Sequence, residues 1–303
     1  NIVDMMDTRF ESIDRCTSFK ELLHDVELLL KEEQLFYGHG TENPKDESMA
    51  IIMHLSKSSD VLNEAELKIA LDDQIREKVK EVLYQRIIES KPLPYITNEA
   101  YFCGKQFYVD ERVLIPRSPI AELINNHFEP WINSTSLNRV LEIGTGSGCI
   151  ALSIAEAFSN VEVVATDIST DAIDVALRNA KAHGLENRVE IIESDLFENV
   201  SGVFDLIITN PPYVPDEIML DLPKEYLHEP HMALAAGDKG LDFISRILHD
   251  APPFLSHNGI VIIEAGVASE NMEQRFDMPF IWIDFEIGGE GVAMIEASNL
   301  RIE

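Results

Sequence analysis

Apolar positions in the first third of the chain recur with the period of an α-helix. Between Phe19 and Leu30 they fall at i, i+3, i+4, i+7, i+10 and i+11, which is one face of a helix. Ser18 and Glu21 have the spacing of a capping box at its start. The pattern predicts a helix over these residues with one side packed against a core.

A second helix is expected from about Asn63 to Ile87. Asn63 is a capping residue type with Glu66 three positions later, and the apolar positions that follow again have a helical period. Residues 37–44, which are rich in Gly and Asn and end in Pro, are expected to form an interhelical loop. Residues 1–97 are therefore predicted to be a small helical domain.

The period changes to strand-like alternation near residue 100. Residues 101–109 alternate apolar and polar positions around Gly104, a pattern typical of a β-hairpin. A helix is expected to begin shortly afterwards, near Ile120. We assign residues 98–119 to a β-hairpin linker between two domains.

The remainder of the chain, residues 120–303, alternates short apolar runs with helical segments. Strands are expected at 140–143, 161–166, 189–192, 204–209 and 260–264. This order predicts a parallel sheet covered by helices on both faces. The runs 280–285 and 292–295 flank a glycine-rich turn that leaves no room for a crossover helix, so they must pair antiparallel. The expected class is α/β, with a Rossmann-like, mostly parallel sheet that ends in an antiparallel hairpin.

The charge of the chain limits its partners. Acidic residues outnumber basic ones 54 to 24, for a formal net charge of −30. Because affinity for nucleic acid depends largely on Lys and Arg, no direct sequence-specific binding to DNA or RNA is expected. An acidic surface can attract a basic partner or can simply keep the protein dissolved, and charge alone leaves both interpretations open.

Other features predict no membrane span, no secretion signal and no metal site. No apolar stretch reaches the ~18 residues that cross a bilayer, and residues 1–10 lack an apolar signal core. The three cysteines lie far apart, which suits a reducing compartment and predicts a cytoplasmic protein. His228 and His231 have a ligand-like spacing, but Pro230 stands between them and no cysteine is near, so no metal site is expected.

A proline corner follows the strand expected at 204–209. Asn210-Pro211-Pro212-Tyr213 is stiff, because each proline fixes its own φ and biases the residue before it away from helix. The corner is expected to hold the Asn210 side chain and the Pro211 carbonyl as preset acceptors beside the Tyr213 ring. Two acceptors and an aromatic face suit a planar NH2 group. The expected catalytic residues are Asn210, Pro211, Pro212 and Tyr213.

A glycine-rich turn follows the first strand of the sheet. The run from Gly144 to Gly148 has glycine at every second position, which allows a tight turn and close approach of a ligand to the backbone. No Lys-Ser/Thr pair follows, which excludes a phosphate-binding P-loop. The spacing also differs from the dinucleotide motif, which disfavours a nicotinamide-dependent dehydrogenase.

Acidic residues mark the ends of the neighbouring strands. Asp167 is placed either to bind the hydroxyls of a ribose or to favour the N-terminus of the next helix. Asp195 could hold an adenine amine, and Glu142 could meet an ammonium group. A ligand with ribose, adenine and ammonium but no phosphate is S-adenosylmethionine. The expected cofactor-binding residues are Glu142, Gly144, Thr145, Gly146, Gly148, Asp167, Ile168, Asp195, Leu196 and Asn210.

Taken in order, these motifs resemble those of class I methyltransferases that act on amino or amide nitrogen. Three further segments, 37–44, 102–110 and 112–119, look like the HemK/PrmB family of protein-glutamine methyltransferases, and the likeness extends over nearly the whole chain. It is closest to the PrmB branch, which acts on large-subunit ribosomal protein L-three. The sister branch, which modifies peptide release factors, carries Pro-Arg-Pro followed by Thr-Glu where Ser118-Pro119-Ile120 stands here.

The resemblance implies methyl transfer from S-adenosylmethionine to the amide nitrogen of a glutamine, with S-adenosylhomocysteine as product. It implies that Asn210 and the Pro211 carbonyl accept the two N–H groups of that amide and that Tyr213 packs against its plane. No general base is expected. The helical domain would recognise a basic ribosomal protein or a ribosome-assembly intermediate. Arg117 would either line the cofactor entrance or form a surface salt bridge.

Three alternatives remain at this point. Enzymes that methylate exocyclic amino groups of rRNA or DNA can share the proline corner, although the acidic charge disfavours them. The substrate could instead be the glutamine of a release factor. A cofactor-binding assembly factor without transfer activity is the third alternative, and the intact corner makes it less attractive.

Overall fold

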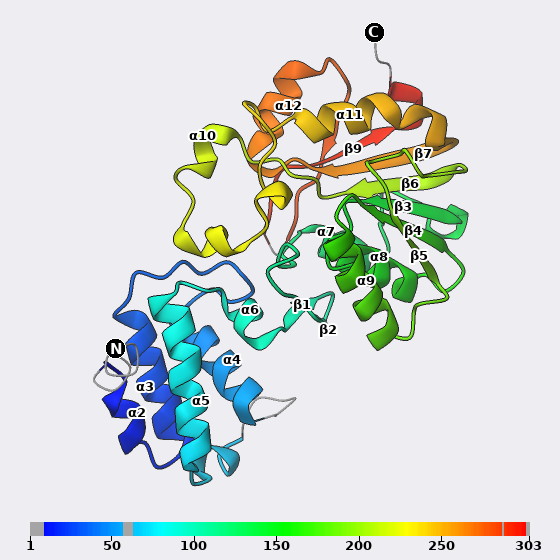
Figure 1. Ribbon diagram of the computed structural model, residues 1–303. Helices are drawn as coiled ribbons and strands as arrows, with labels where there is room; N and C mark the ends of the chain where they lie inside the picture. Colours follow the sequence, from blue (N-terminus) through cyan, green and yellow to red (C-terminus); the bar gives the residue numbers. More distant parts are fainter. Residues whose placement is uncertain (1–8, 57–62, 287, 301–303) are drawn as a thin grey trace. The chain divides into compact units, whose positions relative to one another are not determined.

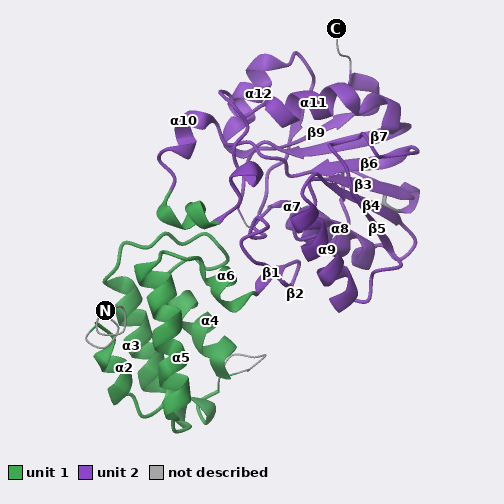
Figure 2. Ribbon diagram, viewed as in Figure 1, with its two compact units in different colours: residues 1–98, 223–228 green, residues 99–222, 229–303 purple. Residues whose placement is uncertain are grey.

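The computed structural model describes residues 9–56, 63–286 and 288–300 (Figure 1). The expectation of no secretion signal therefore falls mostly on residues outside the described part. The chain divides into two compact units, residues 1–98 with 223–228 and residues 99–222 with 229–303 (Figure 2). The hairpin segment predicted as a linker thus belongs to the second unit from residue 99 on, and a short segment near residue 225 belongs to the first.

The first unit is helical. Its elements are α2 Glu11–Arg15, α3 Phe19–Lys31, α4 Pro44–Ser56, η1 Glu66–Lys68, α5 Asp73–Leu83, the π-helical η2 Tyr84–Ile88, α6 Leu93–Thr97 and η4 Lys224–His228. The prediction of α3 is confirmed. The Ser18 side chain accepts a hydrogen bond from the N–H of Glu21, and Leu22 and Val26 of the expected apolar face are fully buried.

The predicted start of the second long helix at Asn63 is wrong. Asn63 makes the expected capping contacts, since its Oδ1 accepts from the N–H groups of Ala65 and Glu66, but the helix that follows is only η1. The chain then extends, with the N–H of Leu71 bonded to the carbonyl of Thr17 at 3.1 Å. Asp72 caps α5 instead. A good cap is satisfied by a single turn, so it does not fix how far a helix runs.

The sequence interpretation also missed α4. The loop before it is present as predicted, but Asn43 ends that loop as a helix cap, since its Oδ1 accepts from the N–H groups of Lys45 and Asp46 at 3.0 Å each. Pro44 occupies the first helical position, where a missing N–H has no cost.

A buried arginine joins three segments of the helical unit. Arg86 is 1% exposed, and its guanidinium donates to Glu47 (2.5 Å), to Glu225 (3.0 Å) and to the carbonyl of Phe36 (2.8 Å). A buried ion needs such partners, because removing one would leave an uncompensated charge. The segment that contains η4 is thereby fixed to the helices of its own unit.

The second unit is built on a seven-stranded sheet with the order β5-β4-β3-β6-β7-β9-β8 (Figure 1). Its strands are β3 Arg139–Ile143, β4 Glu162–Asp167, β5 Val189–Glu193, β6 Phe204–Thr209, β7 Leu255–Glu264, β8 Ile281–Trp282 and β9 Val292–Glu296, and the separate hairpin pairs β1 Ala100–Phe102 with β2 Lys105–Phe107. The first five strands are parallel, and β9 runs antiparallel to both β7 and β8. The predicted sheet and its antiparallel ending are confirmed.

Helices cover both faces of this sheet. The helices of this unit are α7 Ile120–Asn125, α8 Cys149–Ala157, α9 Thr170–Ala182, α10 Asp216–Met219, α11 Asp242–Asp250 and α12 Ser269–Arg275, with 3-10 turns η3 Ser134–Ser136, η5 His231–Ala233, η6 Pro252–Phe254, η7 Gly266–Ala268 and η8 Ala297–Asn299. α7, α8 and α9 pack on one face and α11 and α12 on the other.

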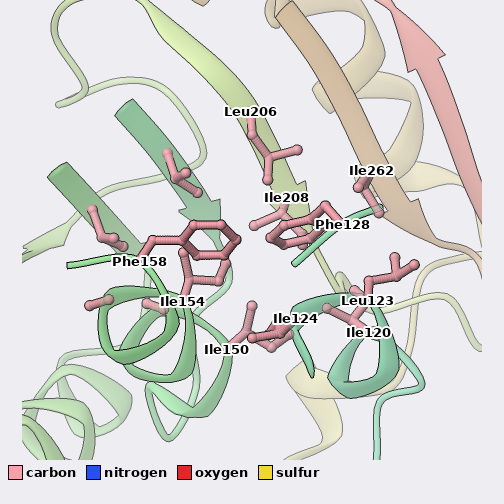
Figure 3. Packing of buried hydrophobic residues seen from close by; sticks show 14 of the residues in the cluster. Ile120, Leu123, Ile124, Phe128, Ile150, Ile154, Phe158, Leu206, Ile208 and Ile262 are labelled. Carbon is pink, nitrogen blue, oxygen red and sulfur yellow. The ribbon is translucent and has the colours of Figure 1, made fainter. Parts of the chain in front are cut away.

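Alternate residues of each buried strand enter two separate cores, as the period of a strand requires. On the α8 side, Leu206 and Ile208 of β6 pack with Ile154 and with the rings of Phe128 and Phe158 (Figure 3). Those two rings stack with their centroids 5.8 Å apart. The sheet is therefore fixed from both sides, and its strand ends form a rigid edge.

Candidate active site

A cavity of about 250 Å³ lies at the point where the strand order of the sheet reverses. β3 and β6 are neighbours there, while the chain proceeds to opposite sides from each, and open α/β sheets bind ligands in the crevice at such a point. Of the predicted site residues, those that line the cavity are Glu142, Gly144, Thr145, Gly146, Asp167, Ile168, Asp195, Leu196, Asn210, Pro211 and Pro212. Gly148 and Tyr213 are not among the described residues that line it.

The glycine turn forms an open wall of the cavity. Gly144 and Gly146 have φ values of +72° and +54°, and a Cβ added at either would meet no atom of the described residues within 4 Å apart from its chain neighbours. The positive φ favours glycine, and the space in front of the backbone allows a ligand to approach it closely. The turn is held from behind, because the N–H of Thr145 donates to the carbonyl of Thr166 at 2.8 Å.

Gly148 has a different role from the other two. A Cβ at this position would lie 3.2 Å from the Cβ of Ala176 and 3.2 Å from Cδ1 of Leu152. The glycine therefore allows the N-terminus of α8 to pack closely on α9. The structure places it behind the cavity wall.

Asp167 links the glycine turn to the next helix. Its two carboxylate oxygens accept from the N–H groups of Gly146 and Ser169, each at 2.9 Å. The cap of α9 is Ser169, whose side chain accepts from the N–H of Ala172. Burial raises the pKa of Asp167, and the backbone hydrogen bonds oppose that shift. The carboxylate both supports the turn and faces the cavity, and its contact with a ribose stays a prediction.

Glu142 is buried at the base of the cavity. Its Oε2 accepts from the hydroxyl of Thr145 at 2.6 Å and from the N–H of Ala151 at 3.0 Å. Burial raises the pKa of Glu142 to about 8 in spite of these bonds. A nearby positive charge would favour the ionised form, so the site is suited to a ligand ammonium group.

Asp195 and Leu196 form the wall at the end of β5. Asp195 pairs with Arg246 of α11 at 2.9 Å, and Leu196 has a positive φ of +49°. The ion pair fixes one carboxylate oxygen of Asp195. Its contact with an adenine amine stays a prediction.

The proline corner brings an unsatisfied acceptor to the cavity. Oδ1 of Asn210 is buried and has no hydrogen-bond partner among the described residues. A buried acceptor without a donor lowers stability by about 1–3 kcal/mol, and a ligand that supplies the donor removes this cost. Because Asn210, Pro211 and Pro212 all line the cavity, the missing donor is expected to come from a ligand.

Tyr213 follows the corner residues that line the cavity and is bonded to a buried glutamate. Its hydroxyl donates to Oε1 of Glu264 at 3.1 Å, and its ring packs among the residues of the core on the α11 side. The structure therefore brings Asn210, Pro211 and Pro212 together at the cavity. The packing of the Tyr213 ring against an amide plane stays a prediction.

Arg117 lines the cavity and is also ion-paired, but the pair is not a surface salt bridge. Its guanidinium contacts both carboxylate oxygens of Glu229, at 2.5 and 2.7 Å, and the Glu229 side chain is fully buried. The interpretation as a plain surface salt bridge is wrong, because the partner lies in the interior. Arg112, a second lining cation, is paired with Asp110 at 2.8 Å.

These ion pairs limit the kinds of ligand that the cavity can bind. A dinucleotide brings a pyrophosphate, which needs uncommitted cations or helix N–H groups. The two arginines that line the cavity are both held by carboxylates, and the wall also carries Glu142, Asp167 and Asp195. This donor set fits a ligand that carries positive charge and no phosphate.

The sequence interpretation missed several residues of the site. Ser118, Glu229 and Glu264 form its buried polar supports, and Met232 and Phe243 are among the apolar residues of its wall. Ser118 lies in a segment that the resemblance had already drawn attention to. The two glutamates follow no motif that could have identified them.

Among the described residues, no three His, Cys, Asp or Glu side chains group as metal ligands. His228 lies in the helical unit, where its Nε2 contacts the carbonyl of Glu89. Cys16, Cys103 and Cys149 are free thiols. None of the described helices is long and apolar enough to span a bilayer.

The chain is similar to known methyltransferases both in its family model and in its overall sequence. A family model described as a methyltransferase small domain matches residues 122–239. The chain is 41% identical over 269 residues to the ribosomal protein uL3 glutamine methyltransferase of Francisella tularensis. The aligned region covers 88% of this chain and 86% of that protein. The enzyme of the same name from Neisseria gonorrhoeae is 38% identical over 94% of this chain and 96% of its own length.

Among solved structures, the catalytic domain of hMettl16 in complex with the MAT2A 3'UTR hairpin 6 is similar over 80% of this chain and 90% of that one. The TM-score is 0.50 and the sequence identity 14%. At this identity the likeness shows the fold alone, and it agrees with the predicted class.

Proposed function

Because this chain belongs to the family of ribosomal protein uL3 glutamine methyltransferases, we propose that it methylates one glutamine side chain of uL3, ribosomal protein L-three. The amide nitrogen gains a methyl group from S-adenosylmethionine and loses one proton, and S-adenosylhomocysteine leaves. The observation that carries this proposal is the buried Oδ1 of Asn210, an acceptor at the cavity for which the described residues provide no donor.

The methyltransferase fold and family imply the use of S-adenosylmethionine, which supplies an electrophilic methyl group on a sulfonium sulfur. The cavity fits this cofactor by its chemistry. The open glycine wall admits a ligand to the backbone, and the lining carboxylates suit a cation. Glu142 would hold the ammonium, Asp167 the ribose hydroxyls and Asp195 the adenine amine.

The proline corner would orient the glutamine amide. This nitrogen is a poor nucleophile because its lone pair is shared with the carbonyl. The amide NH2 has two donors, and Asn210 Oδ1 and the Pro211 carbonyl would accept one each. Fixing a nucleophile in line with its electrophile lowers the barrier, with a ceiling of roughly 7–11 kcal/mol for ideal geometry. The stiff backbone of two prolines keeps both acceptors in place before the substrate arrives.

The proton needs no tuned side chain. Methyl transfer makes the nitrogen cationic, and such a nitrogen releases its proton readily to water. We therefore assign no general base. The reaction depends on the orientation of the amide nitrogen and on the electrophilic methyl group. The hydrogen-bond acceptors in the cavity wall suit such a reaction.

We assign substrate recognition to the helical unit, because the second unit contains the whole cavity. The net charge of −30 supports a basic ribosomal protein, or an assembly intermediate that contains it, as the partner. We therefore propose that residues 1–97 recognise the substrate, that residues 98–119 form a linker and that residues 120–303 carry out methyl transfer.

The direct test supplies the purified enzyme with isotope-labelled S-adenosylmethionine and one of three substrates: uL3, a peptide release factor or protein-free rRNA. Label is expected on uL3 only, and mass spectrometry should assign it to a single glutamine. Label on rRNA would favour amino-group methylation of nucleic acid, which the corner chemistry also permits. In cells that lack the gene, the same glutamine of uL3 should be lighter by one methyl group.

A further inference from the structure

Two hydroxyl groups from distant parts of the second unit meet at one buried carboxylate. The hydroxyl of Ser118 donates to Oε2 of Glu264 at 2.5 Å, and the hydroxyl of Tyr213 donates to Oε1 at 3.1 Å. Glu264 is 5% exposed. Neither the reaction derived above nor the cofactor contacts use this carboxylate.

The carboxylate lies beside the proline corner. Glu264 is the last residue of β7, and the residue before it, Ile263, pairs with Thr209 at the end of β6. Ser118 lines the cavity, and Tyr213 directly follows the three corner residues that line it. Glu264 therefore connects two segments of the cavity wall from behind.

The ring of Tyr213 is confined as well as bonded. A Cβ at Gly266 would lie 2.5 Å from Cε2 and 2.6 Å from Cζ of this ring. Only glycine leaves room for the ring at this distance. The side chain is thus held by a close backbone contact on its ring and by Glu264 at its hydroxyl.

The ionised form of Glu264 suits this arrangement. A carboxylate has acceptors only, so each oxygen can take one hydroxyl. The Ser118 oxygen already accepts from the N–H of Ile120 at 3.2 Å, so its own proton is directed to Glu264. Burial raises the pKa of Glu264, whereas the two hydroxyl bonds and the charge of Arg117 lower it.

We propose that Glu264 is a positioning residue for methyl transfer, which holds Tyr213 and Ser118 and so fixes the downstream end of the Asn210–Pro212 corner. The upstream end is already fixed, because Thr209 is paired with β3 and β7. The inference rests on the proposed function, since the corner matters only if it orients a reacting nitrogen. Orientation errors of about 1 Å can reduce such a rate by ~100-fold.

The test compares steady-state kinetics of Glu264→Gln, Tyr213→Phe and Ser118→Ala with wild type. Each variant is expected to lower kcat, Glu264→Gln by about tenfold or more, while KM for uL3 and the Kd for S-adenosylmethionine stay within about threefold. Tyr213→Phe keeps the ring and removes only the hydroxyl. The control is Tyr101→Phe, which removes a tyrosine hydroxyl at an exposed position of β1 and should leave kcat unchanged.

A double-mutant cycle separates positioning from general loss of stability. If the hydroxyls act through Glu264, the effect of Glu264→Gln should shrink in the Tyr213→Phe background. Full additivity, or a loss that falls on KM alone, would overturn the proposal. Should Glu264→Gln fail to fold, the same cycle between Tyr213→Phe and Ser118→Ala replaces it, and additivity there counts against the proposal in the same way.

A crystal structure of Glu264→Gln tests the inference apart from the substrate. The Tyr213 hydroxyl and the Asn210 side chain are expected to be displaced from their wild-type positions. An unmoved corner contradicts the positioning role. Absence of uL3 methylation by the wild-type enzyme would instead contradict the proposed function, so the two failures can be distinguished.

Discussion

At the scale of single residues, the most informative atom is Oδ1 of Asn210. This buried acceptor has no donor in the described part of the chain, and it is held on a backbone that two prolines make rigid. A polar atom left in this state lowers stability by about 1–3 kcal/mol and is retained where a ligand completes it. The corner sequence alone predicted this acceptor, because its chemistry depends only on adjacent residues.

Asn210→Ala should reduce kcat for uL3 methylation by about 100-fold or more, because one of the two amide contacts disappears in the transition state. Cofactor Kd, measured by calorimetry, should stay within a few fold. Asn125→Ala, which removes an exposed asparagine side chain from α7, is the matched control. Wild-type turnover by Asn210→Ala would remove the basis of the amide assignment.

Glu142 gives a prediction about pH and stability. Its folded pKa of about 8 lies above the ordinary value of 4.5, so folding disfavours the ionised form. The stabilising contribution is complete below pH 4.5 and is lost as the pH rises through 8, at up to about 1.4 kcal/mol per pH unit. Glu142→Gln should therefore be more stable than wild type at pH 8.5, and this difference should shrink toward pH 5.

Urea unfolding of the cofactor-free protein at several pH values measures this difference directly. If the two proteins differed in free energy of unfolding by the same amount at every pH, the ionisation of Glu142 would not cause the expected pH dependence. Added S-adenosylmethionine should reduce the advantage of Glu142→Gln at pH 8.5, because the ammonium group favours the carboxylate of the wild-type protein.

At the scale of elements, one side chain of α9 connects the hairpin to the glycine turn. Asn179 is buried; its amide donates to the carbonyls of Tyr108 (2.9 Å) and Ser147 (2.8 Å), and its oxygen accepts from the N–H of Tyr108 (2.8 Å). Asn179→Ala should lower the free energy of unfolding by about 2–4 kcal/mol, because one buried and two partly buried backbone groups lose their partner.

The reference for this prediction is Lys181→Ala, an exposed position of the same helix, which should stay within about 0.5 kcal/mol of wild type. Denaturant unfolding measures both variants. Cofactor affinity should also fall for Asn179→Ala, since Ser147 belongs to the glycine turn. Equal stabilities of the two variants would show that the hydrogen bonds of Asn179 do not support this region.

The elements also show what a sequence can predict. α3, the parallel strands and the final hairpin follow from local periodicity, and the cavity residues follow because parallel strands end at the same edge. The support network could not be predicted this way. Ser118 lies 146 residues from Glu264, and Arg117 lies 112 residues from Glu229. Such pairs depend on the fold as a whole, and no local spacing indicates them.

At the scale of the whole molecule, the charge of −30 leaves two interpretations, solubility or attraction of a basic substrate. Attraction predicts that raising the salt concentration from about 50 to 300 mM lowers kcat/KM for uL3 severalfold, because the Debye length falls below about 10 Å. A short, uncharged peptide that contains the target glutamine should show little change. Equal salt dependence of both substrates would leave the acidic surface with a role in solubility only.

The proposed reaction depends on the Asn210 side chain and the Pro211 carbonyl, which would hold a glutamine amide by its two hydrogens. The most direct measurement is a crystal structure of the protein with S-adenosylhomocysteine and a uL3 peptide that contains the target glutamine. The amide nitrogen is expected within about 3.2 Å of both acceptors. A glutamine amide bound elsewhere, with Asn210 Oδ1 still lacking a donor, would contradict it.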